Sequence, residues 1–488
     1  MSSQYPNAFG RSFVRASALL ALAAWLPAQA PSATGLLLRG GYESNFFYSG
    51  FVTPITAITK DPSGVMTGAT IDGVIRRLYD ADHNGTVEST LDFWPGTGLF
   101  SVTDILWAPN GTSLYVCHLA TLTRIDDVNA DGVGDVAVNI VVNIPIGFHQ
   151  NNGLLWDGPG HLLVTNGSAT DVGPESSPLS ATILRVDVQT GASTVFATGV
   201  RNCYRLARHP VNGFVFGGEN EWNAHPTKPL VGDEFNVYVQ SQDYGYPNYF
   251  GVPPPGFVGV PPVVQLPPRL APTGLRFNPN VRISGYADEA YMALFSTGVG
   301  RVARIPVWFG PASGLPAGTF EEFVVGLVNP IDVEFTVDGD MLVADFTTSQ
   351  IHRIYPKGGF TLTLGGAPCV GSVVSVRGAA PAHPGALCFL AASDLPLPSF
   401  ALAPGLDVFL DASSWLFLFS LTPGNGVFNF PVPSILNAAG ETTASITIPN
   451  QAVLAGFKIY VAGVAFDAVT GAPLAASPEQ SLLVIPFF

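Results

Sequence analysis

The stretch ITKDPSGVMTGATIDGVIRRL, residues 58–78, decides the fold of this chain. It contains two short apolar strands joined by a tight turn, and a third, alternating strand follows after a second turn. The same pattern returns as ILWAPNGTSLYVCHLATLTRI at residues 105–125. Four further copies begin at Leu154, Leu206, Gly274 and Val333. Six copies spaced by about 45–65 residues match the period of propeller blades. Units of this size cannot bury both faces alone, so the sequence predicts a six-bladed β-propeller over residues 35–357.

Beyond the last copy, residues 358–488 have a different character. They contain short β-like runs such as FTLTLGG at 360–366, separated by turn residues about every 8–12 positions. This spacing predicts a small antiparallel β-sandwich, which is either a structural part or a module for carbohydrate or surface association. Cys369 and Cys388 are either a disulfide pair or two buried free thiols.

Composition and the N-terminus restrict the class of protein. Hydrophobic residues make up 47% of the chain, charged residues 12%, and the formal net charge is −15. A negative chain lacks the field that binds phosphates, which excludes nucleic-acid binding, and its hydrophobicity excludes a long disordered chain. Residues 1–30 combine Arg11 and Arg15 with an apolar run and a small-residue end at Ala28 and Ala30. This arrangement predicts a signal peptide and a periplasmic, extracellular or cell-surface protein without a transmembrane anchor.

Two acidic loops have the spacing of calcium ligands. Each supplies oxygen donors at positions 1, 3, 5 and 9 and a glycine at position 6; the donors are Asp80, Asp82, Asn84 and Glu88, then Asp127, Asn129, Asp131 and Asp135. Ca²⁺ prefers six to eight oxygen ligands, which such a loop presents from alternate residues. The spacing resembles the calcium loops of integrin-type propellers and the start of the EF-hand loop. Because both loops follow the third strand of a repeat, we expect two calcium sites that stiffen outer hairpins; solvated acidic turns are the alternative.

Three segments carry a resemblance to a known family. They are HQNNGLLWDGPGHLLVTNG from His149, GVRN at 199–202, and GDEFNVYVQSQDYGYP at 232–247. Their order resembles the soluble glucose/sorbosone dehydrogenases that depend on pyrroloquinoline quinone (PQQ), which are six-bladed propellers, and the likeness spans about 300 residues. The acidic loops and the C-terminal segment also resemble parts of secreted planctomycete-type bacterial proteins. The resemblance implies an exported quinone-dependent enzyme that oxidises a sugar or a related alcohol or aldehyde.

The same resemblance implies roles for individual residues. His149 would be the base that takes a proton from the sugar hydroxyl, a task suited to a neutral imidazole. Arg201 would polarise the quinone carbonyl, and Asn202 would contact the cofactor.

The chain departs from the family pattern at four positions. Ser168 stands where the family has the Asp that orients the catalytic His. Neutral residues replace a Lys and two Arg that would hold PQQ, and they are Gly298, Asn329 and Ile331. Arg301 and Arg304 are the nearby cations that could replace them. The departures keep an alternative open: a calcium-stabilised, catalytically degenerate propeller that binds glycans or proteins at the cell surface. A hydrolase resembling the lactonase propellers, with an axial metal, is a third reading.

Overall fold

The computed structural model describes residues 32–222, 230–287, 289–296, 298–309, 316–396, 399–404, 406–431, 433–478 and 480–485. The predicted signal peptide lies outside these residues. Within them the chain is nearly all β, with one short helix, α1 (Trp415–Ser420), and one 3₁₀ turn (Ala452–Leu454). None of the described helices is long and apolar enough to cross a membrane.

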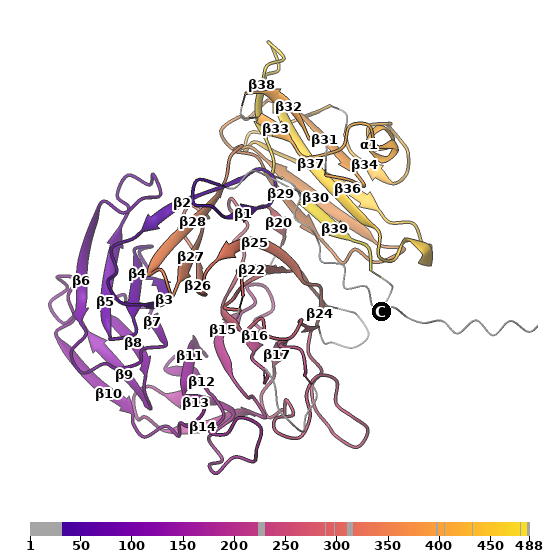
Figure 1. Ribbon diagram of the computed structural model, residues 1–488. Coiled ribbons are helices and arrows are strands. Elements are labelled where there is room, and N and C mark those ends of the chain that lie inside the picture. Colours follow the sequence, from indigo (N-terminus) through magenta and orange to yellow (C-terminus); the bar gives the residue numbers. More distant parts are fainter. Residues whose placement is uncertain are drawn as a thin grey trace, which may run out of the picture.

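Six antiparallel sheets form the propeller, as the repeats predict (Figure 1). Blade 1 consists of β3 (Ile55–Lys60), β4 (Met66–Thr70), β5 (Val74–Tyr79) and β6 (Ser89–Pro95). Blade 2 consists of β7 (Asp104–Trp107), β8 (Ser113–His118), β9 (Thr121–Asp126) and β10 (Val136–Val141). Blade 3 consists of β11 (Asn151–Trp156), β12 (His161–Asn166), β13 (Thr182–Asp187) and β14 (Ser193–Thr198). Blade 4 consists of β15 (Cys203–Arg208), β16 (Val215–Glu219), β17 (Glu234–Tyr238) and β18 (Val264–Gln265).

The N-terminal strands complete the last two blades. Blade 5 consists of β19 (Pro272–Phe277), β21 (Ala290–Leu294), β22 (Gly300–Ile305) and β25 (Glu321–Leu327), with β1 (Leu37–Leu38) at its edge. Blade 6 consists of β26 (Pro330–Phe335), β27 (Met341–Asp345) and β28 (Gln350–Pro356), and its outer strand is β2 (Tyr42–Tyr48). Both ends of the propeller sequence therefore meet in one sheet, which closes the ring and covers an otherwise open edge.

The inner strand of each blade contacts the inner strands of its neighbours around the axis, in the order β3, β7, β11, β15, β19 and β26, and β26 contacts β3 again. The second strands β4 and β8 are buried along their whole length, whereas the outer strand β10 is mostly exposed. Apolar side chains such as Ile75, Phe93 and Ile125 fill the space between blades 1 and 2. Burial thus decreases outward across a blade, so that solvent-exposed side chains lie mainly on its outer strand.

Residues after the last blade form two packed antiparallel sheets, as predicted. One contains β29 (Thr361–Gly365), β30 (Val373–Ala379), β36 (Glu441–Thr447) and β34 (Phe428–Asn429). The other contains β35 (Ser434–Ile435), β31 (Leu387–Ser393), β37 (Lys458–Phe466), β38 (Pro473–Ala476) and β39 (Gln480–Leu483). Cys369 and Cys388 are buried and free, so of the two readings the thiols hold and the disulfide does not. Cys388 lies on β31 of the second sheet. Cys369 lies in the turn before β30, where its backbone forms an isolated β-bridge with Ile485.

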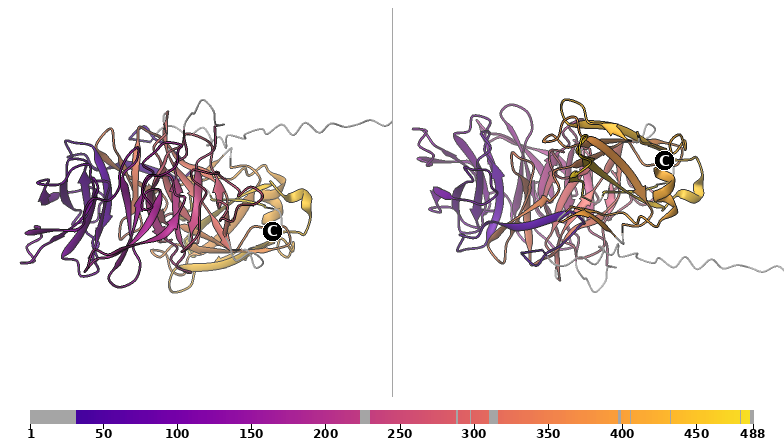
Figure 2. Two further views of the ribbon diagram at one scale, coloured as in Figure 1. Left: turned by 90° about the horizontal axis from the view of Figure 1, so that it is seen from below. Right: turned by 90° about the horizontal axis from the view of Figure 1, so that it is seen from above.

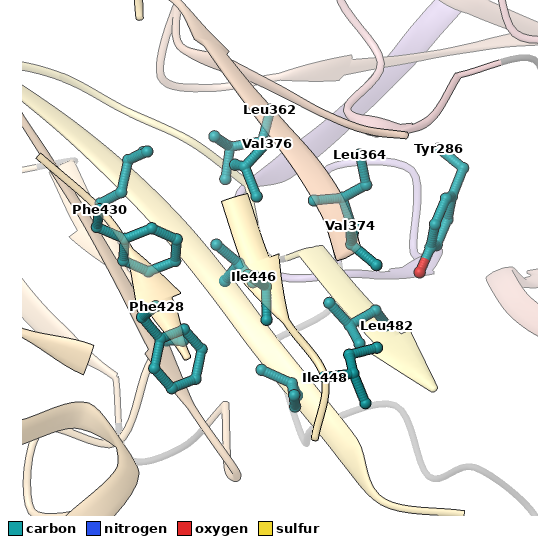
Figure 3. Close-up of a cluster of buried hydrophobic side chains, with 14 of the residues drawn as sticks. Tyr286, Leu362, Leu364, Val374, Val376, Phe428, Phe430, Ile446, Ile448 and Leu482 are labelled. Carbon is teal, nitrogen blue, oxygen red and sulfur yellow. The ribbon is translucent and has the colours of Figure 1, made fainter. Parts of the chain in front are cut away.

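Blade 5 contributes directly to this sandwich. Its excursion β20 (Gly285–Tyr286) pairs in parallel with β29, and Tyr286 lies in the sandwich core beside Leu364 and Val374 (Figure 3). The sandwich sits at the rim of the ring, next to blade 5, in the views along and across the propeller (Figures 1 and 2). It is therefore packed onto the propeller through shared sheet and shared core, not joined by a linker alone.

Candidate functional site

Loops at one end of blades 3 to 5 surround a cavity of about 200 Å³. These loops precede the inner strands β11, β15 and β19 or join the second strand of a blade to the third, so antiparallel geometry places them on one face, called here the site face. The residues that line the cavity are Phe148, His149, Asp171, Arg201, Asn202, Asn220, Glu221, Asp233 and Ala271. The three site residues named from the sequence, His149, Arg201 and Asn202, all belong to this set.

Backbone contacts fix His149 at the cavity. Its N–H donates to the carbonyl of Ser168 at 2.9 Å, and Gly167 passes so close that a Cβ there would lie 2.5 Å from the Cβ of His149. A glycine is therefore required at position 167 for the imidazole to keep its place. The ring packs edge-on against Phe148, with 4.9 Å between ring centroids.

The imidazole of His149 is neutral over the physiological range. Burial and the nearby guanidinium of Arg201 lower its pKa to about 3, while Asp171 opposes this shift. Among the described residues its Nε2 has no hydrogen-bond partner although the atom is buried. A buried imidazole nitrogen without a partner is a candidate contact for a ligand hydroxyl.

Arg201 is held rigidly at the same cavity. Its side chain is 4% exposed; Nη2 lies 2.5 Å from Oδ1 of Asp171, Nε donates to the backbone carbonyl of Asp171 at 3.0 Å, and Nη1 donates to the carbonyl of Asn220 at 2.7 Å. The guanidinium also lies 6.0 Å from the Phe148 ring centroid. Its charge is thus largely balanced by Asp171, which limits its attraction for a further anion.

The departure at Ser168 has a structural consequence. Ser168 is fully buried, its N–H donates to the carbonyl of Arg201 at 2.7 Å, and its position supplies no carboxylate to the imidazole. The nearest acidic residue in sequence, Asp171, pairs with Arg201. Asn202 accepts a hydrogen bond from Asn152 at 2.9 Å, which fixes its amide at the cavity wall.

Sequence reasoning missed the acidic side of this cavity. Glu221 and Asp233 line it, and Glu219 and Glu234 lie next to Glu221 without lining the cavity. The three glutamates place one carboxylate oxygen each within 4.8 Å of one another. Burial and the neighbouring carboxylates raise the pKa of Glu219 to about 8. The signal was present as G-E-N-E at 218–221 and G-D-E-F-N at 232–236, but it depends on two strands, β16 and β17, being paired side by side.

The cations proposed to compensate for missing PQQ ligands do not reach this cavity. Arg301 pairs with Glu322 at 2.7 Å on the outer part of blade 5, and Arg304 is buried against Glu289 at 2.6 Å. Neither arginine lines the cavity, so the structure gives no support to the substitute role suggested for them. The three positions where the family has cations hold neutral residues here: Gly298, Asn329 and Ile331. The side-chain amide of Asn329 donates to the carbonyl of Phe295.

Both acidic loops lie on the opposite face of the propeller. They join the third and fourth strands of blades 1 and 2, and each wraps around its first carboxylate: the Gly85 N–H donates to Asp80 and the Gly132 N–H donates to Asp127, both at 2.9 Å. In the first loop, oxygens of Asp80, Asp82 and Glu88 converge within 4.8 Å. Among the described residues the second loop does not form such a group, and its donors are Asp127, Asn129, Asp131 and Asp135.

Comparison with known proteins places the fold. No family model matches the chain. An uncharacterized protein of Borreliella burgdorferi is 24% identical over 201 residues, 36% of this chain and 52% of that protein, so the chain spans about half the length of the curated relative it matches.

Three solved structures are similar over most of the propeller. The calcium structure of the Trichoderma reesei family AA12 enzyme has a TM-score of 0.56 at 18% identity and covers 68% of this chain and 98% of its own. The holo PQQ domain of pyranose dehydrogenase from Coprinopsis cinerea has a TM-score of 0.56 at 16% identity and covers 67% and 99%. The PQQ-bound aldose sugar dehydrogenase of Streptomyces coelicolor has a TM-score of 0.51 at 17% identity and covers 65% and 99%. The chain therefore has the propeller fold of the soluble sugar dehydrogenases.

Proposed function

We propose that this chain is a sugar-binding propeller whose ligand site is the His149–Arg201 cavity, and that it works without PQQ. The observation that carries the proposal is the half-buried, neutral imidazole of His149, whose buried Nε2 lacks a partner among the described residues. It shares a cavity with a guanidinium, three carboxyl groups and the exposed ring of Phe148. Acceptors and donors around an apolar surface suit a polyol, since each hydroxyl both donates and accepts.

The cavity does not fit PQQ. That cofactor carries three carboxylates, whereas the described lining residues hold three carboxylates of their own and a single cation, Arg201, which is already paired with Asp171. Two anions brought together in a buried site repel each other strongly. We therefore assign no step at this site to a quinone, although His149 and Arg201 share a cavity as the resemblance implies.

A binding experiment distinguishes sugar binding without PQQ from PQQ-dependent sugar oxidation. Calorimetric titration with a panel of aldoses is expected to give saturable heats, and replacement of His149 with Ala should weaken binding by about tenfold, the effect of one lost hydrogen bond to a buried group. The control is H161A, because His161 is on β12 and its ring contacts the exposed Pro159 carbonyl. Titration with PQQ and calcium should give no stoichiometric spectral change. Dye reduction with any aldose after PQQ loading would overturn the proposal.

We also propose that the first acidic loop binds calcium. Its three carboxylates converge, and Asp80 keeps one buried oxygen, Oδ1, without a hydrogen-bond partner among the described residues. Burial and the charges of Glu88 and Asp82 raise the pKa of Asp80, a repulsion that a divalent cation would relieve. The second loop is proposed as a weaker site.

Calcium is expected to stabilise the propeller. At a hundredfold excess over its Kd, a ligand that binds only the folded state adds about 2.7 kcal/mol to the free energy of unfolding. Thermal unfolding after chelation and after calcium addition measures this, and D82N should abolish most of the gain. D92N, on the neighbouring strand β6 and outside the cluster, should keep it. Equal transitions with and without calcium would contradict the proposal.

Export remains part of the proposed function. Residues 1–30 have the pattern of a signal peptide. We propose a periplasmic, extracellular or cell-surface location and, at the cell surface, association of the sandwich with glycans. Mass spectrometry of the N-terminus of the secreted chain tests cleavage near Ala30.

A further inference from the structure

The charges around the site cavity are unbalanced. Among the described residues that line it, Asp171, Glu221 and Asp233 carry carboxylates, and Arg201 is the one Lys or Arg. Arg201 and Asp171 neutralise each other at 2.5 Å. The other two carboxyl groups, those of Glu221 and Asp233, form no ion pair with a cation among the described residues, and only the charge of Arg201 acts on them.

Most carboxylates of this wall are fully engaged by the protein. Oδ1 of Asp233 accepts the N–H of Glu221 at 2.9 Å, and its Oδ2 accepts the N–H groups of Leu270 and Ala271 at 2.8 and 2.9 Å. Asp233 therefore has its oxygens occupied by backbone donors and serves to position the loops around it.

The two glutamates behind the wall are engaged in the same way. Glu219 accepts the N–H of Arg201 at 2.5 Å and the hydroxyl of Tyr238 at 3.1 Å. Glu234 accepts the N–H of Gly251 at 2.5 Å and the amide of Asn236 at 3.0 Å. These contacts fix both side chains and leave little capacity for a ligand.

Glu221 is different. It is 5% exposed, it lines the cavity, and its Oε2 is buried without a hydrogen-bond donor among the described residues. Burial and the charges of Glu219 and Glu234 raise its pKa well above the ordinary value, because the charged form is disfavoured there. A buried carboxyl with unused hydrogen-bonding capacity, beside a ligand cavity, is a contact that a complementary ligand group would complete.

We infer that the cavity selects a sugar that carries a primary amino group, with the ammonium placed against Glu221 and a ring hydroxyl at Nε2 of His149. The inference rests on the proposed function, because it specifies the class of sugar for the same site. An ammonium is the ligand group that supplies both the missing donors and the missing positive charge. Because the pKa of Glu221 is raised in the free protein, a bound ammonium lowers it again and shifts the carboxyl toward loss of its proton to solvent.

Calorimetry with the full-length secreted protein tests this choice. The probes are glucosamine, glucose and N-acetylglucosamine, which share a ring while only the first carries an ammonium. Wild-type protein is expected to bind glucosamine about tenfold or more tightly than either neutral sugar, as for other buried charge pairs. Titration in buffers of different ionisation enthalpy should show release of a proton with glucosamine and none with glucose.

Variants assign the effect to one side chain. E221Q keeps the size of the residue and should remove both the preference and the proton release while glucose affinity stays within about threefold. E322Q is the matched control, because Glu322 is on blade 5 and pairs with Arg301. Equal affinities for the three sugars, or a preference that persists in E221Q, would overturn this inference alone. Binding of none of the sugars would overturn the proposed function, and binding of calcium alone that E221Q abolishes would assign the wall to a metal instead.

Discussion

Replacement of Arg205 by methionine is expected to lower the free energy of unfolding by about 3–5 kcal/mol, the effect of removing one partner of a buried ion pair. Arg205 lies on the inner strand β15 and is 1% exposed. Its guanidinium forms ion pairs with Asp104 on β7 and Asp332 on β26. One side chain thus joins the inner strands of blades 2, 4 and 6 across the propeller axis.

Among the described residues the two aspartates form no ion pair with another cation, and Arg276 reaches Asp332 only through its charge. Oδ2 of Asp104 accepts the N–H of Leu154 at 2.7 Å, and Oδ2 of Asp332 accepts the N–H of Ile58 at 2.8 Å, so neutral donors would remain. Burial raises the pKa of Asp332 and Arg205 opposes that rise. Without Arg205 the folded state would therefore bind protons more tightly than the unfolded chain, and stability would fall as pH rises.

Chemical denaturation followed by circular dichroism measures the loss. The deficit of R205M relative to wild type should shrink as the pH falls toward the ordinary carboxyl range, because protonation discharges the two aspartates. R208M is the control on the same strand, since Arg208 is 36% exposed and pairs with Asp157 at 3.1 Å; it should change stability by about 1 kcal/mol at most. A loss in R205M that matched R208M, or that did not depend on pH, would show that the triad contributes little.

Local pattern explains why the blades were predictable and this triad was not. Each blade is formed by about 50 consecutive residues in the order strand, turn and strand, so the burial pattern is already visible in residues 58–78. Arg205 and Asp332 are 127 residues apart and meet only because the ring closes. No periodicity marks such a pair.

The candidate site shows the same contrast between local sequence patterns and contacts that only the fold creates. His149 and Arg201 were found because they belong to segments that resemble a family, and the structure places them at one cavity. Asp171 was visible three residues after Ser168, but its pairing with Arg201 depends on contact between a loop of blade 3 and the connection from blade 3 to blade 4. Glu221 stands outside any motif, and its significance comes from burial, which a sequence does not display.

Deletion of residues 358–488 is expected to leave a propeller that aggregates or fails to fold. Tyr286 and Trp308, both from blade 5, are buried in the core of the sandwich, and removal would expose them. The cut would also break the pairing of β20 with β29 and the ion pair of Lys458 with Glu321 at 3.1 Å. Expression of residues 31–357 without the sandwich, followed by gel filtration, tests this expectation.

The charges at the junction would be left uncompensated as well. Burial favours the neutral form of Glu321, but Arg39, Lys458 and Arg304 outweigh it and lower the pKa of Glu321 to about 2. Arg39 also donates to the hydroxyl of Ser481 on β39 at 3.1 Å. Deletion removes Lys458 and Ser481 together, so a buried carboxylate on blade 5 would lose one cation and its two arginines would lose the sandwich that shields them.

A pair of tryptophan variants distinguishes a specific junction from a general loss of surface. W308A should lower the free energy of unfolding by about 3–5 kcal/mol, because Trp308 is 6% exposed and packs edge-on against Tyr286, with 5.6 Å between the ring centroids. W415A, in α1 of the sandwich where Trp415 is 66% exposed, should change it by about 0.5 kcal/mol or less. A soluble, monomeric propeller with a cooperative transition after deletion, together with a mild W308A, would show that the two parts fold independently. The shared strand and core argue for the opposite result: the sandwich is the outer wall of blade 5, and the propeller is expected to require it.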